Sequence, residues 1–227
     1  NIKLLTLFIL SFILLFFMKF YVLLALLPCL IGYFISAKFQ VKHPFTVYSS
    51  IVLVFSVLAF NSKEIPPHFD FVETLITKQK NFIRLAEVTE PGSKFELTKL
   101  EPTFFGVVRA VPEALANCFI RPLITKGNQF IFLPSIIENT FLVTLIILSF
   151  FSGLKRKVKL TIETKNIFWF SVFFTLILFT IIGLTTPVSG ALVRYKIPAL
   201  PFLGIAILTF LNINYISEKI PFLKFLK

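Results

Sequence analysis

Long runs of apolar residues, separated by polar segments, are the main pattern of this chain. Six runs stand out, at residues 4–17, 20–37, 45–60, 136–151, 167–184 and 197–213. A transmembrane helix needs about 20 apolar residues, with a range of roughly 17–25. The run at 4–17 falls short of that length, and the other five approach it once flanking small or polar residues are included. The pattern predicts an all-α integral membrane protein with about six transmembrane helices.

The longest polar interval, residues 61–134, has an internal pattern of its own. Residues 67–87 place apolar side chains at helical spacing, which predicts an amphipathic helix on the membrane or on neighbouring helices. A Pro-Gly-Ser step at 91–93 ends that helix. The alternating sequence KFELTKL at 94–100 indicates a short extended segment, and residues 103–120 indicate another helix.

These patterns divide the chain into three parts. Residues 1–60 hold the N-terminal transmembrane helices, residues 61–134 form an extracytoplasmic helical segment, and residues 135–227 hold three transmembrane helices and a basic cytoplasmic tail. The chain starts without methionine and is apolar from Leu4. We therefore expect an excerpt of a longer protein, in which the first transmembrane helix, or several earlier ones, is cut.

Basic residues set the orientation that we expect. Short cytoplasmic loops of membrane proteins carry an excess of lysine and arginine. The connection at 154–166 has one acidic residue, Glu163, and five basic ones: Lys155, Arg156, Lys157, Lys159 and Lys165. We therefore place residues 154–166 and the C-terminus, with Lys219, Lys224 and Lys227, in the cytoplasm. Residues 61–134 then lie outside the cell membrane.

Composition supports a membrane protein and excludes several other classes. The chain is 56% hydrophobic and 15% charged, with 31 Phe and a mean hydropathy of +0.88. Its net charge of +12 resides mostly at the ends of apolar runs, where anionic lipid explains it better than nucleic acid does. The two cysteines and two histidines are not at metal-ligand spacing. P-loop, dinucleotide-binding, serine-hydrolase and zinc-protease motifs are absent.

Arg194 and Lys196 are the leading candidates for ligand binding, because charge beside hydrocarbon is costly. They can hold a phosphate at the outer membrane face, helped by the flexible Ser189-Gly190 turn. Alternatively they extend to the headgroups and anchor the last helix.

Asp70 and Glu138 are the candidate catalytic carboxylates. Asp70, the only aspartate, can act as a general base for a hydroxyl acceptor, or it can simply stabilise the first turn of a helix. Glu138 stands where the fourth apolar run begins, and a carboxylate there needs a partner or a wet cavity. Arg121 or Arg194 can supply that partner. Arg109 is a further candidate cation, which can also pair with Glu113 four residues on.

Three stretches carry a resemblance: KLEPTFFGVVRAVPEALANCFIRPL, PSIIENTF and TTPVSGALVRYKIPALPF. They resemble the C-terminal part of poorly characterised bacterial inner-membrane proteins from surface-polysaccharide loci, described as glycosyltransferase-like or polymerase-like. The resemblance covers residues 94–213. It implies a role with lipid-linked sugars at the outer face of the inner membrane, with polyprenyl phosphate as the lipid ligand. Arg194, Lys196, Arg121 and Arg109 would then bind the carrier phosphate.

One departure weakens an enzymatic role. Membrane glycosyltransferases that use polyprenyl-phosphate sugars carry an acidic residue just after a span in the first outer loop, whereas residues 18–20 here offer only Lys19. Two alternatives therefore stay open beside saccharide chemistry. One is a non-catalytic subunit that packs against membrane-protein partners, and the other is a transporter, for which the apolar runs provide few polar residues.

Overall fold

The computed structural model describes residues 2–64, 70–122, 129–154 and 160–211, and the side chains of 129–132 are not described. Several predictions concern residues outside these ranges. They include the basic cluster Lys155, Arg156, Lys157 and Lys159, and the C-terminal lysines Lys219, Lys224 and Lys227.

The described chain is helical, with no β-strand among its elements. The long helices are α1 (Ile2–Met18), α2 (Phe20–Lys38), α3 (Pro44–Phe60), α4 (Phe71–Thr89), α5 (Phe104–Ile120), α6 (Gln129–Leu154) and α7 (Ile162–Thr185). Two short ones complete the fold, α8 (Ser189–Lys196) and α9 (Leu200–Phe210), joined by the single turn Ile197–Ala199. The structure thus confirms the prediction of an all-α fold.

Four stretches of these residues are long and apolar enough to cross a membrane: α2, Leu133–Leu154 of α6, α7, and Ser189–Phe210, which joins α8 to α9. The predicted number of about six is not reached. Helices α1 and α3 are apolar, but each has 17 residues, which corresponds to about 26 Å at 1.5 Å per residue. That is slightly less than the roughly 30 Å of a typical hydrocarbon core.

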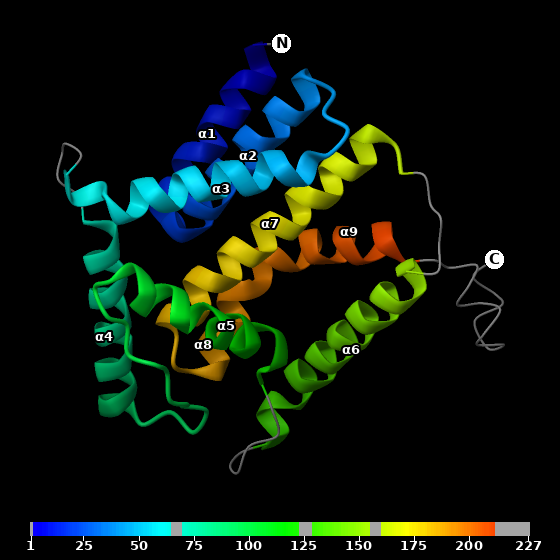
Figure 1. Ribbon diagram of the computed structural model, residues 1–227. Helices are drawn as coiled ribbons and strands as arrows, with labels where there is room; N and C mark the ends of the chain where they lie inside the picture. Colours follow the sequence, from blue (N-terminus) through cyan, green and yellow to red (C-terminus); the bar gives the residue numbers. More distant parts are fainter. Residues whose placement is uncertain (1, 65–69, 123–128, 155–159, 212–227) are drawn as a thin grey trace, which may run out of the picture.

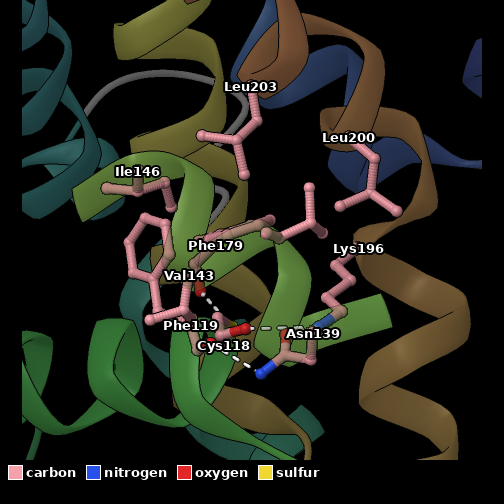
Figure 2. A pocket seen from close by; sticks show the side chains of 10 residues that line it. Cys118, Phe119, Asn139, Val143, Ile146, Phe179, Lys196, Leu200 and Leu203 are labelled. Carbon is pink, nitrogen blue, oxygen red and sulfur yellow. Dashed lines mark hydrogen bonds between the residues drawn. The ribbon is translucent and has the colours of Figure 1, made fainter. Parts of the chain in front are cut away.

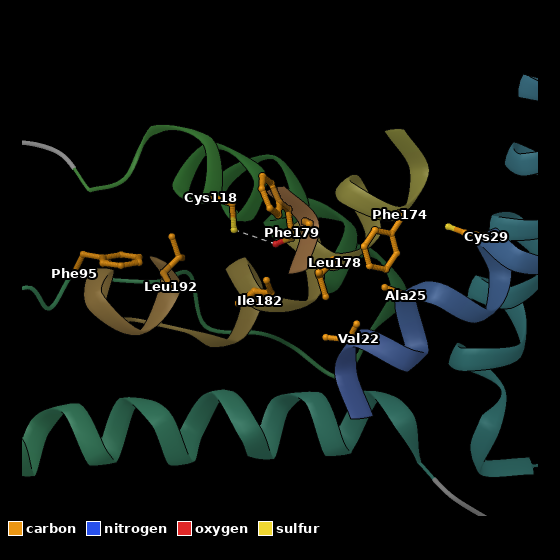
Figure 3. Packing of buried hydrophobic residues seen from close by; sticks show 11 residues of the cluster. Val22, Ala25, Cys29, Phe95, Cys118, Phe174, Leu178, Phe179, Ile182 and Leu192 are labelled. Atoms are coloured by element: carbon orange, nitrogen blue, oxygen red, sulfur yellow. Dashed lines mark hydrogen bonds between the residues drawn. The ribbon is translucent and has the colours of Figure 1, made fainter. Parts of the chain in front are cut away.

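Helix α7 is the centre of the molecule and packs against α2, α3, α4, α5, α8 and α9. In Figure 1, the junction of α2 with α3 lies near the start of α7, towards the right, as do the ends of α6 and α9. Helices α4, α5 and α8 lie at the other end of α7. Aromatic and aliphatic side chains of α7, including Phe174, Leu178 and Ile182, fill the core against Val22 and Ala25 of α2 (Figure 3). This packing places α7 at the centre of the core, with α4, α5 and α8 at one of its ends.

A layer made of α4, the segment 93–100, α5 and α8 lies at one end of α7. Helix α4 buries Val72, Leu75 and Ile76 and exposes its polar face, as its predicted amphipathic pattern requires. The segment predicted to be extended forms one antiparallel β-bridge, between Lys94 and Val188. Phe95 N–H donates to the Pro187 carbonyl at 2.9 Å, and Ser189 N–H donates to the Ser93 carbonyl at 3.1 Å.

Gln79 joins this layer to α7. It is 2% exposed, and its side-chain amide donates to the carbonyls of Thr98 at 3.0 Å and Leu184 at 2.8 Å. Its amide oxygen accepts from Leu100 N–H at 3.0 Å. A buried backbone group without a partner costs free energy, so one glutamine on α4 stabilises both the extended segment and the end of α7.

Candidate functional site

Lys196, the last residue of α8, is buried rather than directed to solvent. Only 3% of it is exposed. Its ammonium donates to Asn139 Oδ1 at 2.7 Å and, over longer distances, to the carbonyls of Arg121 at 3.4 Å and Cys118 at 3.5 Å. An ammonium has three N–H donors, so these three acceptors occupy all of them.

Asn139 of α6 completes the same cluster from the other side (Figure 2). Its side-chain amide donates to the carbonyls of Phe119 at 2.8 Å and Ile120 at 2.9 Å. The last carbonyls of a helix have no partner within the helix. At the end of α5, Lys196 and Asn139 supply these partners, while the Asn117 carbonyl accepts from Arg121 N–H at 3.0 Å. The backbone carbonyls of residues 117–121 are therefore all hydrogen-bonded.

The space beside Lys196 is small. A cavity of about 10 Å³ is lined by Lys196, Asn139, Cys118 and apolar side chains such as Leu142 and Phe179. That volume is about the size of one water molecule. The Cys118 thiol donates to the Phe179 carbonyl at 3.2 Å. A cavity of this size has no room for a phosphate.

Arg121 lies at the end of α5 and stacks on an aromatic ring. Its guanidinium carbon is 4.0 Å from the centre of the Phe95 ring, and its Nε donates to Asn117 Oδ1 at 2.8 Å. Burial lowers the pKa of this guanidinium, while the Glu113 carboxylate opposes that shift. A stacked arginine of this kind ties segment 93–100 to α5 by a cation–π contact.

Arg194 and Lys196 are two residues apart in sequence but lie in different surroundings. Arg194 is exposed, and its Nε donates to the Gly190 carbonyl of its own helix at 3.3 Å. Lys196 is buried against α5 and α6. The structure therefore does not bring the two cations together as one phosphate clamp.

The two candidate carboxylates lie on different helices and make different interactions. Asp70 caps α4, where its Oδ1 accepts from Glu73 N–H at 2.8 Å. Glu138 is exposed on α6 and interacts electrostatically with Lys196. The sequence offered Glu113 as a partner for Arg109. Its carboxylate instead accepts hydrogen bonds from the backbone N–H and the hydroxyl of Thr98.

Arg109 lines a separate surface groove of about 280 Å³ at the N-terminal end of α5. The groove walls carry two cations, one carboxylate, two hydroxyls and an aromatic ring, from Lys99, Arg109, Glu101, Thr98, Thr103 and Phe105, with Gly106 between them. The Phe105 side chain is 82% exposed. In the described part of the chain, no group of three His, Cys, Asp or Glu side chains is placed to hold a metal ion.

No protein-family model, no curated protein and no solved structure matches the chain.

Sequence reasoning missed Asn139, Gln79 and the residues Lys99 and Glu101 of the groove. For two of them, Asn139 and Gln79, the sequence gives a weak indication. Asn139 lies within an apolar run and Gln79 on the apolar side of an amphipathic helix, positions at which a polar side chain needs a partner. Lys99 and Glu101 lie in the resemblance stretch but have ordinary surface character in the sequence.

Proposed function

We propose that this chain binds a lipid-linked saccharide of the polyprenyl-phosphate type at the membrane face that carries α4, α5 and α8. The observation that carries the proposal is the groove at the N-terminal end of α5. It combines cations for a phosphate with hydroxyls, a carboxylate and an exposed aromatic ring for a sugar.

Each groove residue has a role that follows from its chemistry. Arg109 and Lys99 neutralise the phosphate, since guanidinium and ammonium groups form charge-assisted hydrogen bonds to phosphate oxygens. Glu101 accepts hydrogen bonds from sugar hydroxyls, and Phe105 packs against the apolar face of a sugar ring. Arg194, exposed on α8 at the same end of the molecule, is a further cation for the phosphate. Lys196 is left out of the ligand site because its donors are occupied.

The finer membrane arrangement is part of the same proposal. If α1 and α3 also cross the membrane, six spans alternate in direction and residues 61–134 lie outside the bacterial inner membrane. The basic residues Lys38 and Lys42 then lie in the cytoplasm with residues 154–166. Reporter fusions after residue 42 and after residue 92 should give opposite sides, and a shared side would contradict this topology.

Native mass spectrometry of protein gently extracted from its own membrane tests the binding. We expect a polyprenyl-phosphate species on the parent protein, strongly reduced in Arg109→Ala and in Arg194→Ala. The matched control is Arg84→Ala, because Arg84 is an exposed arginine of α4 outside the groove. Equal lipid retention in the Arg109 and Arg84 variants would refute the groove as the binding site.

A non-catalytic membrane subunit is the second candidate, and α1 favours it. This helix has no buried residue, so its apolar surface is open along its length to lipid or to another protein. Stoichiometric protein partners in the same mass spectra, without carrier lipid, would favour this function over the first.

A further inference from the structure

The exposed face of α5 is apolar, although α5 belongs to the polar interval of the chain. Its exposed residues at helical spacing are Phe105, Val108, Pro112, Ala116 and Ile120. One charged residue, Arg109, lies on this face near its N-terminal end. The exposed face of α4 is more polar, since it carries Glu73, Thr77, Lys80, Arg84 and Glu87 beside the apolar Leu85 and Val88. The two helices of one layer therefore differ in the polarity of their exposed faces.

The depth of α5 explains this difference. Its C-terminal half runs antiparallel to the end of α7, because Ala114 lies against Gly183 and the Cys118 thiol bonds the Phe179 carbonyl. Both α7 positions lie within the apolar stretch of a candidate span. The end of α5 also reaches Asn139, which lies inside the candidate span Leu133–Leu154 of α6. The C-terminal half of α5 is thus level with the apolar parts of two membrane helices.

Ending a helix at that depth requires partners for its last carbonyls. Irregular backbone is tolerated within the hydrocarbon layer only where protein or a water-filled cavity satisfies it. Lys196 and Asn139 satisfy the carbonyls of residues 118–121. A helix that ends in water would not need these two side chains, because water would hydrogen-bond its last carbonyls.

We propose that α5 is a re-entrant helix, which dips from the outer surface into one leaflet and faces acyl chains with its apolar stripe. Arg109 and Lys99, at the N-terminal end of α5, then lie at the headgroup level, where basic side chains meet anionic lipid. Helix α6 also exposes apolar residues, such as Ile137 and Phe141. This inference concerns the membrane surface of the protein and does not depend on the saccharide ligand.

Fluorescence quenching in lipid vesicles tests the proposal. A single cysteine is introduced as Ala116→Cys on α5, Thr77→Cys on the exposed face of α4, or Ile147→Cys on the exposed apolar face of α6. The native Cys29 and Cys118 are 0% and 1% exposed, so the unsubstituted protein measures background labelling. Each variant is labelled with a bimane, reconstituted into phosphatidylethanolamine–phosphatidylglycerol vesicles, and quenched with doxyl-labelled lipid or with iodide.

The proposal predicts that the label at residue 116 behaves like the label at 147. Its quenching by doxyl lipid relative to iodide should be severalfold greater than that of the label at residue 77. A label at 116 that is quenched mainly by iodide would place α5 in water and overturn the proposal. A label at 116 quenched by neither agent would mean that protein covers the stripe, and that result overturns it as well.

Discussion

Lys196 shows how a single buried cation can hold one helix end in place. Its three acceptors come from α5, α6 and the α5–α6 connection, which are 57 to 78 positions away in the sequence. Replacing one member of such a buried cluster leaves the other groups without partners, which costs about 1–3 kcal/mol for each neutral group. The cluster therefore accounts for a cation inside a candidate span without any ligand.

The variant Lys196→Met tests this role. Methionine keeps the length of the side chain but cannot donate, so we expect a loss of at least about 1–3 kcal/mol in unfolding free energy, the cost of one unsatisfied buried polar group, because three acceptors lose their donor. Thermal unfolding in one detergent gives the measurement, with the exposed Arg194→Met as its control. A Lys196→Met protein as stable as the parent would show that the hydrogen bonds at the end of α5 are dispensable.

At the residue scale, the sequence allowed part of this picture to be predicted. Asp70 stands where an amphipathic pattern begins, and its role in stabilising the first helical turn could be inferred from local sequence alone. Lys196 could not be treated in the same way. Its partners are distant in sequence, so nothing nearby distinguishes a lysine that reaches headgroups from one that caps another helix.

At the scale of elements, the contact between α5 and α7 depends on one small residue. A Cβ atom at Gly183 would overlap the Ala114 carbonyl. Backbone atoms cannot move aside as a flexible side chain can, so any larger residue must separate the two helices. The close approach is what brings α5 level with the apolar part of α7.

Gly183→Ala is therefore expected to destabilise the protein by about 1–3 kcal/mol, the usual cost of overpacking. Gly204→Ala is the matched control on α9, because a Cβ there meets no atom within 4 Å. The control should be neutral or slightly stabilising, since alanine favours a helix more than glycine does. Thermal unfolding of both variants gives the comparison, and equal stability of the two would contradict the close packing of α5 on α7.

Helices α2, α4 and α7 were predictable because apolar length and helical spacing are local properties of the sequence. The β-bridge at Lys94 also lies in a stretch whose alternating sequence pattern predicts an extended segment. The position of α5 was not predictable, because its pattern shows two apolar sides and cannot say which faces protein and which faces lipid. The prediction of about six spans exceeds the four found because α1 and α3 each have 17 residues. That length is at the lower limit for a helix that crosses the membrane.

At the scale of the whole molecule, the fold separates a membrane-embedded body from a polar layer at one end of α7 (Figure 1). The groove lies in that layer, and α5, which lines it, packs on the apolar helix α7. This arrangement suits a ligand with a polar head and a long apolar chain. It also places the candidate residues Asp70 and Glu138 outside the lining of the groove.

Photo-crosslinking in vesicles with a diazirine-bearing polyprenyl-phosphate saccharide tests the central claim most directly. The account predicts saturable labelling of the peptide that contains residues 98–109, competed by unlabelled carrier and lost in Arg109→Ala but retained in Arg84→Ala. Labelling confined to other peptides, or labelling that does not saturate, would contradict the assignment of a lipid-linked saccharide to this groove.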